Sequence, residues 1–223
     1  MTFNAILVSL VAHGASLPEG FSPVVSPTDA PKQYEQWASD KGRPGSLACA
    51  RVWTADSLLC FRTQDGKVRR WVLHEDLRSQ NLTLDGLVAS ARKDALVHLS
   101  DVERVPVDGM DKTYWRLRAT DGWAAAALLV PGELVAKISS PTPLYVAFPT
   151  HDVALIWSSG DPELDHVMLV GAREMYDQMP GQVSPAAHLW TGEEWRRGGE
   201  AVRVEQKPES EKSGADGTRT HDL

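Results

Sequence analysis

The sequence lacks most of the short motifs that mark catalysis or cofactor binding. It has no GxGxxG or GxxxxGK[ST] loop to hold phosphates, and no GxSxG turn to present a nucleophile. Neither HExxH nor another zinc-type spacing is present, and a zinc site needs three or four ligands at such spacings. We therefore expect no cofactor and no metal, and no motif indicates a type of reaction.

Cysteine is scarce as well. Cys49 and Cys60 are the only two, and they do not form a CxxC pair. A disulfide between them would require Cα atoms within about 7 Å of each other. Because nothing else in the chain resembles a disulfide-rich scaffold, we expect two half-buried thiols in a reducing cytoplasm.

Long hydrophobic runs are also missing. The most apolar stretch near the start, residues 3–11, is too short to cross a bilayer. No Lys or Arg precedes it, whereas a signal peptide begins with a positively charged region. We interpret this stretch as a first strand or helix, or a poorly ordered start. We expect a cytoplasmic protein without a membrane partner, with secretion as the alternative.

The chain lacks a positive net charge. Its formal charge is −7, whereas a general nucleic-acid binder needs a basic surface. Eight Trp residues are spread through the sequence, which favours packing over a stacking platform for nucleic acid or sugar, because such a platform needs aromatic residues interleaved with basic ones. We therefore do not expect a nucleic-acid partner. The sequence does not identify the partner, and a partner protein is one of the alternatives.

The composition that is present, 42% hydrophobic and 24% charged, is typical of a globular protein. Residues 1–46 are rich in Pro and Gly, and we expect mostly loop there, with at most a short helix over 33–39. Residues 47–205 are expected to form a single α+β domain. Residues 206–223 have no large apolar side chain before Leu223, which predicts a disordered tail.

Strand-like runs alternate with turn signals in this domain. Asp65-Gly66 separates residues 57–63 from 68–74, and Asp121-Gly122 separates 113–119 from 123–130. Asp-Gly between such runs is a strong hairpin signal. Further strands are predicted at 144–148, 153–158, 186–190 and about 201–204.

Helix signals lie between these hairpins. Thr83 is a candidate N-cap for a helix over about 84–98, and Asp161-Pro162 begins another that ends before Pro180-Gly181. A shorter helix is predicted over 132–139. The fold class is therefore α+β: a largely antiparallel sheet built from hairpins, with two or three helices packed on one face.

Two groups of residues are candidates for chemistry. The first is Arg70, His74 and Asp76, which would bind an anion or support acid–base catalysis if they converge. The more economical interpretation is that Asp76 caps the following turn and His74 pairs with it. The second is His151 and Asp152 in a tight connection, where Asp152 is equally well explained as a turn residue. A site joining both groups would require them to meet in space.

Two segments resemble the YtpQ-like bacterial proteins of unknown function. They are Arg69 to Leu77 at the end of the first hairpin, together with the helix after it, and Ala147 to Trp157 around Pro149. The resemblance covers about residues 47–205. The family's pattern carries Arg where this chain has His151. The family has no established activity, so the resemblance implies a fold and nothing catalytic.

The missing motifs and the aromatic-rich strands favour a non-enzymatic binding or interaction protein. The alternative is a hydrolase-like enzyme that uses His74/Asp76 and His151/Asp152. A divalent metal that assists the reaction is one variant of this alternative.

Overall fold

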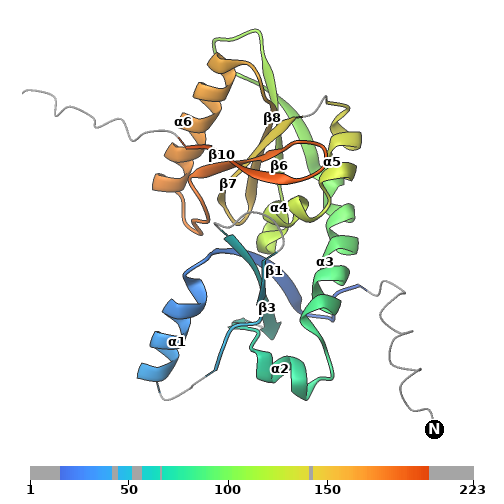
Figure 1. Cartoon of the computed structure of the whole chain (residues 1–223), viewed down its shortest axis with the longest axis vertical. Helices are drawn as coiled ribbons and strands as arrows, with labels where there is room; N and C mark the ends of the chain where they lie inside the picture. Colours follow the sequence, from blue (N-terminus) through green and yellow to red (C-terminus); the bar gives the residue numbers. More distant parts are fainter. Residues whose placement is uncertain (1–15, 42–44, 52–56, 66, 141–142, 201–223) are drawn as a thin grey trace, which may run out of the picture.

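The protein folds into two antiparallel sheets with helices packed against them, one sheet above the other and joined at a waist (Figure 1). The computed structural model describes residues 16–41, 45–51, 57–65, 67–140 and 143–200. The predicted α+β class is confirmed, with antiparallel strands divided between two sheets. The apolar run at 3–11 and the tail at 206–223 lie outside the described residues.

The first sheet forms the lower part of the molecule in Figure 1. Its strands are β1 (Phe21–Pro27), β2 (Cys49–Ala50), β3 (Ser57–Asp65) and β4 (Val68–Trp71), in the order β1-β3-β2 with β4 also paired to β3. The predicted β3–β4 hairpin is confirmed, since Asp65 pairs with Val68. Gly66 in its turn lies outside the described residues. Helix α1 (Ala30–Asp40) follows β1, and α2 (His74–Ser79) follows β4.

Strand β1 lies in the segment that we expected to be mostly loop. Its side chains Val24 and Val25 are 1% and 0% exposed, so the segment contributes to the core. Pro23 and Pro27 obscured this strand in the sequence, because Pro removes a backbone donor. An edge strand tolerates that loss, and β1 is an edge strand paired only to β3 within its sheet.

The second sheet has the order β10-β9-β7-β8-β6-β5. Its strands are β5 (Val102–Pro106), β6 (Thr113–Arg118), β7 (Leu144–Thr150), β8 (Val153–Ser158), β9 (Ala186–Trp190) and β10 (Trp195–Glu200). The predicted β7–β8 pair and β9 are confirmed. The closing strand begins earlier than the predicted 201–204, because the β9–β10 turn is tight.

Asp121-Gly122 does not make the predicted hairpin. Thr120–Gly122 is a 3-10 turn (η2) that leads into α4 (Trp123–Ala126) and η3 (Ala127–Leu129), so the expected return strand is helical. Ala has the highest helix propensity, and four Ala residues follow Trp123. Strand β6 pairs with β5 and β8 instead.

The three predicted helices are present. Helix α3 (Leu84–His98) begins after Thr83, whose Oγ1 accepts a hydrogen bond from the Gly86 N–H at 3.1 Å, and ends in the turn η1 (Leu99–Asp101). Helix α6 (Pro162–Gln178) is capped by the Asp161 carboxylate. The short helix α5 (Pro131–Ile138) ends at Ser139, which has a left-handed backbone.

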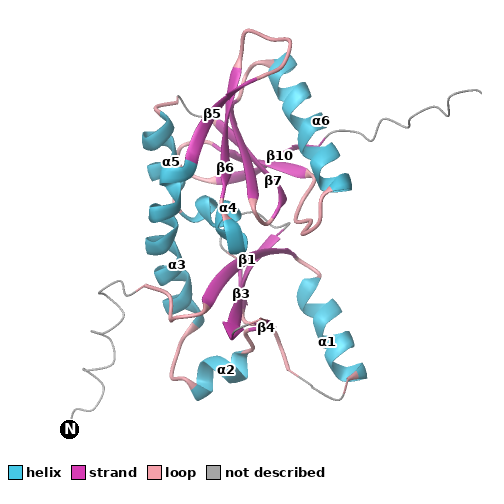
Figure 2. Ribbon diagram, turned by 180° about the vertical axis from the view of Figure 1, so that it is seen from behind, coloured by secondary structure: helices cyan, strands magenta, loops and turns pink. Residues whose placement is uncertain are grey.

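The second sheet is covered on both faces, as the two opposite views show (Figures 1 and 2). On β8, Leu155 and Trp157 pack with Met168 of α6, while Ile156 faces a larger core shared with α3, α4 and the first sheet. This alternation follows from the two-residue period of a strand. The prediction that helices cover one face therefore understates the packing on this sheet.

The two cysteines are bonded to each other, which corrects the expectation of free thiols. Cys49 and Cys60 are direct partners across β2 and β3, and their Cα atoms are 4.1 Å apart. The register of β2, which is only two residues long, decided this pairing, and it was not readable from the sequence.

Candidate functional site: a cationic cavity at the waist

In the first candidate group, Asp76 has a structural role. Asp76 Oδ2 accepts a hydrogen bond from the Leu73 N–H at 2.8 Å, which caps the start of α2. His74 is exposed, and its backbone N–H donates to the Ser46 carbonyl at 3.1 Å. Arg70 is exposed on β4. Asp76 thus has the capping role that the more economical interpretation gave it.

The second candidate group lies in the turn between β7 and β8, next to the first sheet. Asp152 Oδ1 accepts a hydrogen bond from the Gly122 N–H at 3.2 Å, and its backbone carbonyl accepts from Ala119 at 3.1 Å. The His151 N–H donates to the Gly181 carbonyl at 3.0 Å. These bonds hold the turn against the η2 segment on one side and the segment after α6 on the other.

A cavity of about 240 Å³ opens where this turn meets the first sheet. We call it the waist cavity, and its wall includes Ser22, Arg62, Arg69, Gly122, His151 and Asp152. The structure therefore brings His151 and Asp152 together with two arginines of the β3–β4 hairpin. Arg70, His74 and Asp76 are not part of this wall.

Strand register explains why these arginines share the cavity. Arg62 pairs with Ser22 on β1 and with Trp71 on β4, so the three side chains form one row across the sheet. Arg69 pairs with Gln64, two residues further along the same face, and its Nε donates to Gln64 Oε1 at 3.3 Å. Alternation along β4 could have identified Arg69 in place of Arg70, but Arg62 gave no local signal.

Arg62 links the sheet to the turn. Its guanidinium carbon lies 4.9 Å from the centroid of the Trp71 ring, a cation–π distance. Its Nη2 lies 3.4 Å from His151 Nε2. A guanidinium only donates hydrogen bonds, so Nε2 of the imidazole accepts and Nδ1 carries the hydrogen.

His151 is held in its neutral form. Burial first, and then the positive charge of Arg62, lower the pKa of His151 to about 4 against the opposing effect of Asp152. Its Nδ1 is buried and, within the part of the chain that the structure describes, makes no hydrogen bond. At neutral pH the wall therefore holds two positive charges, from Arg62 and Arg69, and one negative charge, from Asp152.

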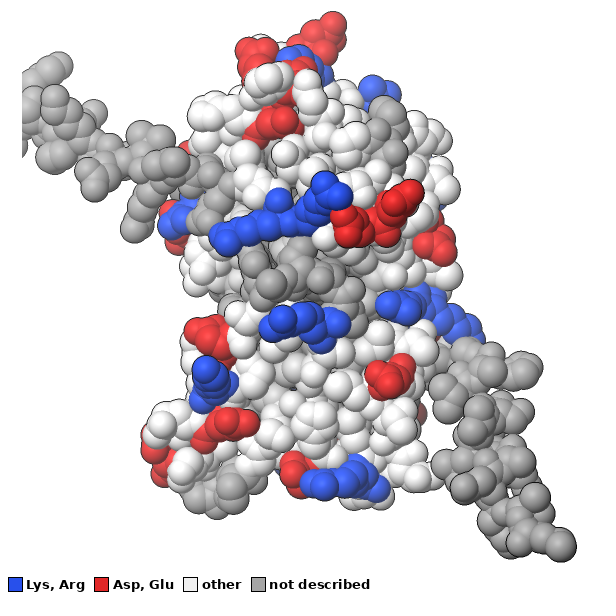
Figure 3. Space-filling model, viewed as in Figure 1, with Lys and Arg blue, Asp and Glu red and all other residues white. Residues whose placement is uncertain are grey.

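Figure 3 shows several Lys and Arg side chains near the waist on one face, with Asp and Glu side chains beside them. Positively charged groups in a cavity wall attract small anions, and a guanidinium group matches the oxygens of carboxylate or phosphate.

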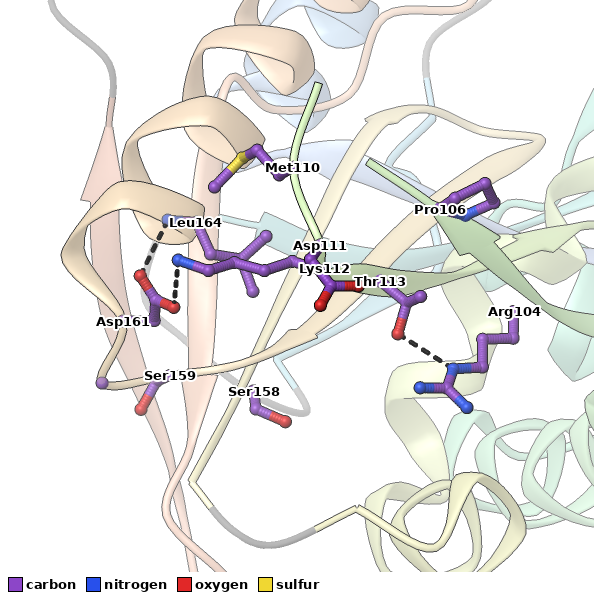
Figure 4. A pocket seen from close by; sticks show the side chains of 11 residues that line it. Arg104, Pro106, Met110, Asp111, Lys112, Thr113, Ser158, Ser159, Asp161 and Leu164 are labelled. Carbon is purple, nitrogen blue, oxygen red and sulfur yellow. Dashed lines mark hydrogen bonds and ion pairs between the residues drawn. The ribbon is translucent and has the colours of Figure 1, made fainter. Parts of the chain in front are cut away.

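A second cavity, of about 540 Å³, lies beside the start of α6 (Figure 4). Lys112 reaches Asp161 at 2.5 Å and Glu163 at 3.2 Å, while Arg104 lies at the other end and donates to Thr113. Hydrogen bonding to Asp161 raises the pKa of Lys112, and the same bond lowers the pKa of Asp161. The charges compensate each other, so this cluster ties the β5–β6 loop to α6.

Within the described ranges, no group of three or more His, Cys, Asp or Glu side chains is placed to hold a metal ion. No helix of the described residues combines the length and apolarity needed to cross a membrane. Comparison with known proteins returned no matching family model, no matching curated protein and no matching solved structure. The proposed role of the chain therefore depends on the site itself.

Proposed function

We propose that the protein is a non-enzymatic binding protein whose waist cavity takes an anionic group, a carboxylate or a phosphate, of a small ligand or a partner protein. The supporting observation is the placement of Arg62 and Arg69 around a cavity of about 240 Å³ whose imidazole is neutral. A neutral imidazole adds no charge to a wall that contains the Arg62 and Arg69 guanidinium groups and the Asp152 carboxylate.

The hydrolase-like alternative has weaker support from the same residues. A general base works best when its pKa lies near the working pH, and the pKa of His151 is about 4. Asp152 Oδ1 is engaged by the Gly122 N–H, and Asp76 caps α2.

The cytoplasmic location also remains a proposal. The Cys49–Cys60 disulfide favours an oxidising compartment, since cytoplasmic thiols are kept reduced. This bond weighs towards the secreted alternative. Membership of the YtpQ-like family remains a proposal of the same standing.

Thermal unfolding in a series of anions tests the binding proposal. Phosphate, sulfate, acetate and citrate would be compared at ionic strength matched with NaCl. A ligand at 100 times its Kd stabilises the folded state by about 2.7 kcal/mol. For a chain of this size that is a rise in Tm of roughly 5–10 °C. We expect such a rise with at least one anion and its loss in Arg69→Gln.

Arg78→Gln is the matched control, because Arg78 is an exposed arginine of α2 outside the cavity wall. The proposal would be contradicted if Arg69→Gln and Arg78→Gln lost the anion-induced rise in Tm equally. It would also be contradicted if no anion raised the Tm saturably. Turnover of ester or phosphate substrates, or stabilisation by a divalent metal that disappears in His151→Ala, would support the enzyme instead.

A further inference from the structure

A third cavity, of about 430 Å³, lies where the β9–β10 hairpin meets α3 and the start of α5. Its volume falls within the range of small-molecule sites. Its wall contains two tryptophans, Trp190 and Trp195, with Arg92, Glu193 and Glu194. None of these residues belongs to the waist cavity, so the two sites are independent.

The aromatic part of this wall is held in place. Trp190 and Trp195 are direct partners across β9 and β10, with ring centroids 5.2 Å apart and planes at 53°. The Trp195 Nε1–H donates to the Leu128 carbonyl at 3.3 Å, which fixes the ring relative to η3. Both side chains are only partly buried, so apolar ring surface faces the cavity.

Polar groups of both signs surround the tryptophans. Glu194 is bound by the Arg196 guanidinium at 2.8 and 2.6 Å, which neutralises its charge. Arg92 and Glu193 are exposed, and among the described residues neither side chain makes a hydrogen bond or ion pair. One free donor group and one free acceptor group therefore stand beside an aromatic surface.

The free donor and the free acceptor beside the aromatic rings restrict which kind of ligand the cavity can bind. An anion would meet the Glu193 carboxylate, and a cation would meet the Arg92 guanidinium. A wholly apolar ligand would desolvate both groups without replacing their hydrogen bonds. A neutral molecule with an apolar face and a rim of hydroxyls satisfies every part of the wall, because hydroxyls both donate and accept.

We propose that the cavity at Trp190 and Trp195 is a saccharide-binding site. The C–H face of a sugar ring lies against the indole rings, and its hydroxyls donate to Glu193 and accept from Arg92. The assignment depends on no property of the anion site.

Titration of the protein with neutral oligosaccharides tests this site. Di- and trisaccharides of glucose, mannose, xylose and N-acetylglucosamine would be followed by tryptophan fluorescence and by isothermal titration calorimetry. We expect saturable binding of at least one, and a loss of affinity of about tenfold or more in Glu193→Gln. Arg92→Gln should weaken the same ligand, and it serves as a second variant on a different element.

Glu35→Gln is the matched control, since Glu35 is exposed on α1 and lies outside this cavity. It should bind as the natural chain does. The proposal is overturned if no saccharide binds saturably up to 10 mM (roughly the weakest affinity of interest). It is also overturned if Glu193→Gln and Glu35→Gln behave alike, or if phosphate displaces the sugar.

Discussion

His151 makes the folded protein sensitive to acid. Its pKa is about 4 in the folded state, against an ordinary value of 6.5. Between these values the unfolded chain binds one more proton than the folded chain at this residue. The contribution of the neutral imidazole to the free energy of unfolding is therefore fully present above about pH 6.5 and is lost as the pH falls towards 4.

Replacing His151 with Gln, which does not titrate, should reduce this sensitivity. The free energy of unfolding of His151→Gln should fall less steeply than that of the natural chain between pH 6.5 and 4. Urea unfolding at a series of pH values measures both slopes. His74→Gln is the control, because His74 is exposed at the start of α2. An unchanged slope in His151→Gln would show that burial does not hold the imidazole neutral.

Gly122 is required by its surroundings. Its φ is 88°, which side chains rarely adopt, and a Cβ there would overlap the Pro23 carbonyl oxygen. Gly122→Ala should therefore lower the free energy of unfolding by about 2 kcal/mol or more.

The control for this change is Gly132→Ala in the first turn of α5, where a Cβ would meet no atom within 4 Å. Ala is the better helix former, so Gly132→Ala should be neutral or stabilising by up to about 1 kcal/mol. Chemical denaturation of the two variants compares them directly. Equal effects at Gly122 and Gly132 would rule out the close approach to β1.

At the scale of the elements, α3 depends on its N-cap. Thr83 Oγ1 is the acceptor for the Gly86 N–H, which otherwise has no partner within the helix. Thr83→Ala should lower the free energy of unfolding by about 1 kcal/mol, whereas Thr83→Ser keeps the hydroxyl and should lose little. Thermal or urea unfolding of both variants checks this. Similar losses in the two would assign the effect to the Thr methyl group.

Elements whose signals are local could be predicted from the sequence. The bounds of α3 and the start of α6 follow from Thr83 and Asp161, because caps and apolar stripes act within a few residues. The Asp65-Gly66 hairpin formed for the same reason. Asp121-Gly122 carries the same dipeptide, but Gly122 packs on β1 and donates to Asp152, so tertiary contacts override the turn preference.

The residues of the candidate sites also differ in whether the sequence could predict them. His151 and Asp152 could be proposed from their turn, since the β7 and β8 patterns on either side are clear. Arg62 could not, because only the meeting of the two sheets places a β3 side chain 3.4 Å from His151. The Trp190–Trp195 pair required the exact start of β10, which the sequence pattern placed too late.

At the scale of the whole molecule, the waist joins two sheets through η2 and α4, which pack against β1. The cavity lies at this junction and takes its wall from both parts. A ligand that bridges Arg62 or Arg69 of the first sheet and the β7–β8 turn of the second would stabilise the junction along with the site.

The most direct measurement is a phosphate titration followed by amide chemical shifts in a ¹⁵N-labelled protein. We expect saturable shifts centred on Ser22, Gly122 and Gly181 at the waist, and none at Gly86 in α3. Shifts scattered over the surface, or growing linearly with phosphate at every exposed amide, would contradict a defined anion site.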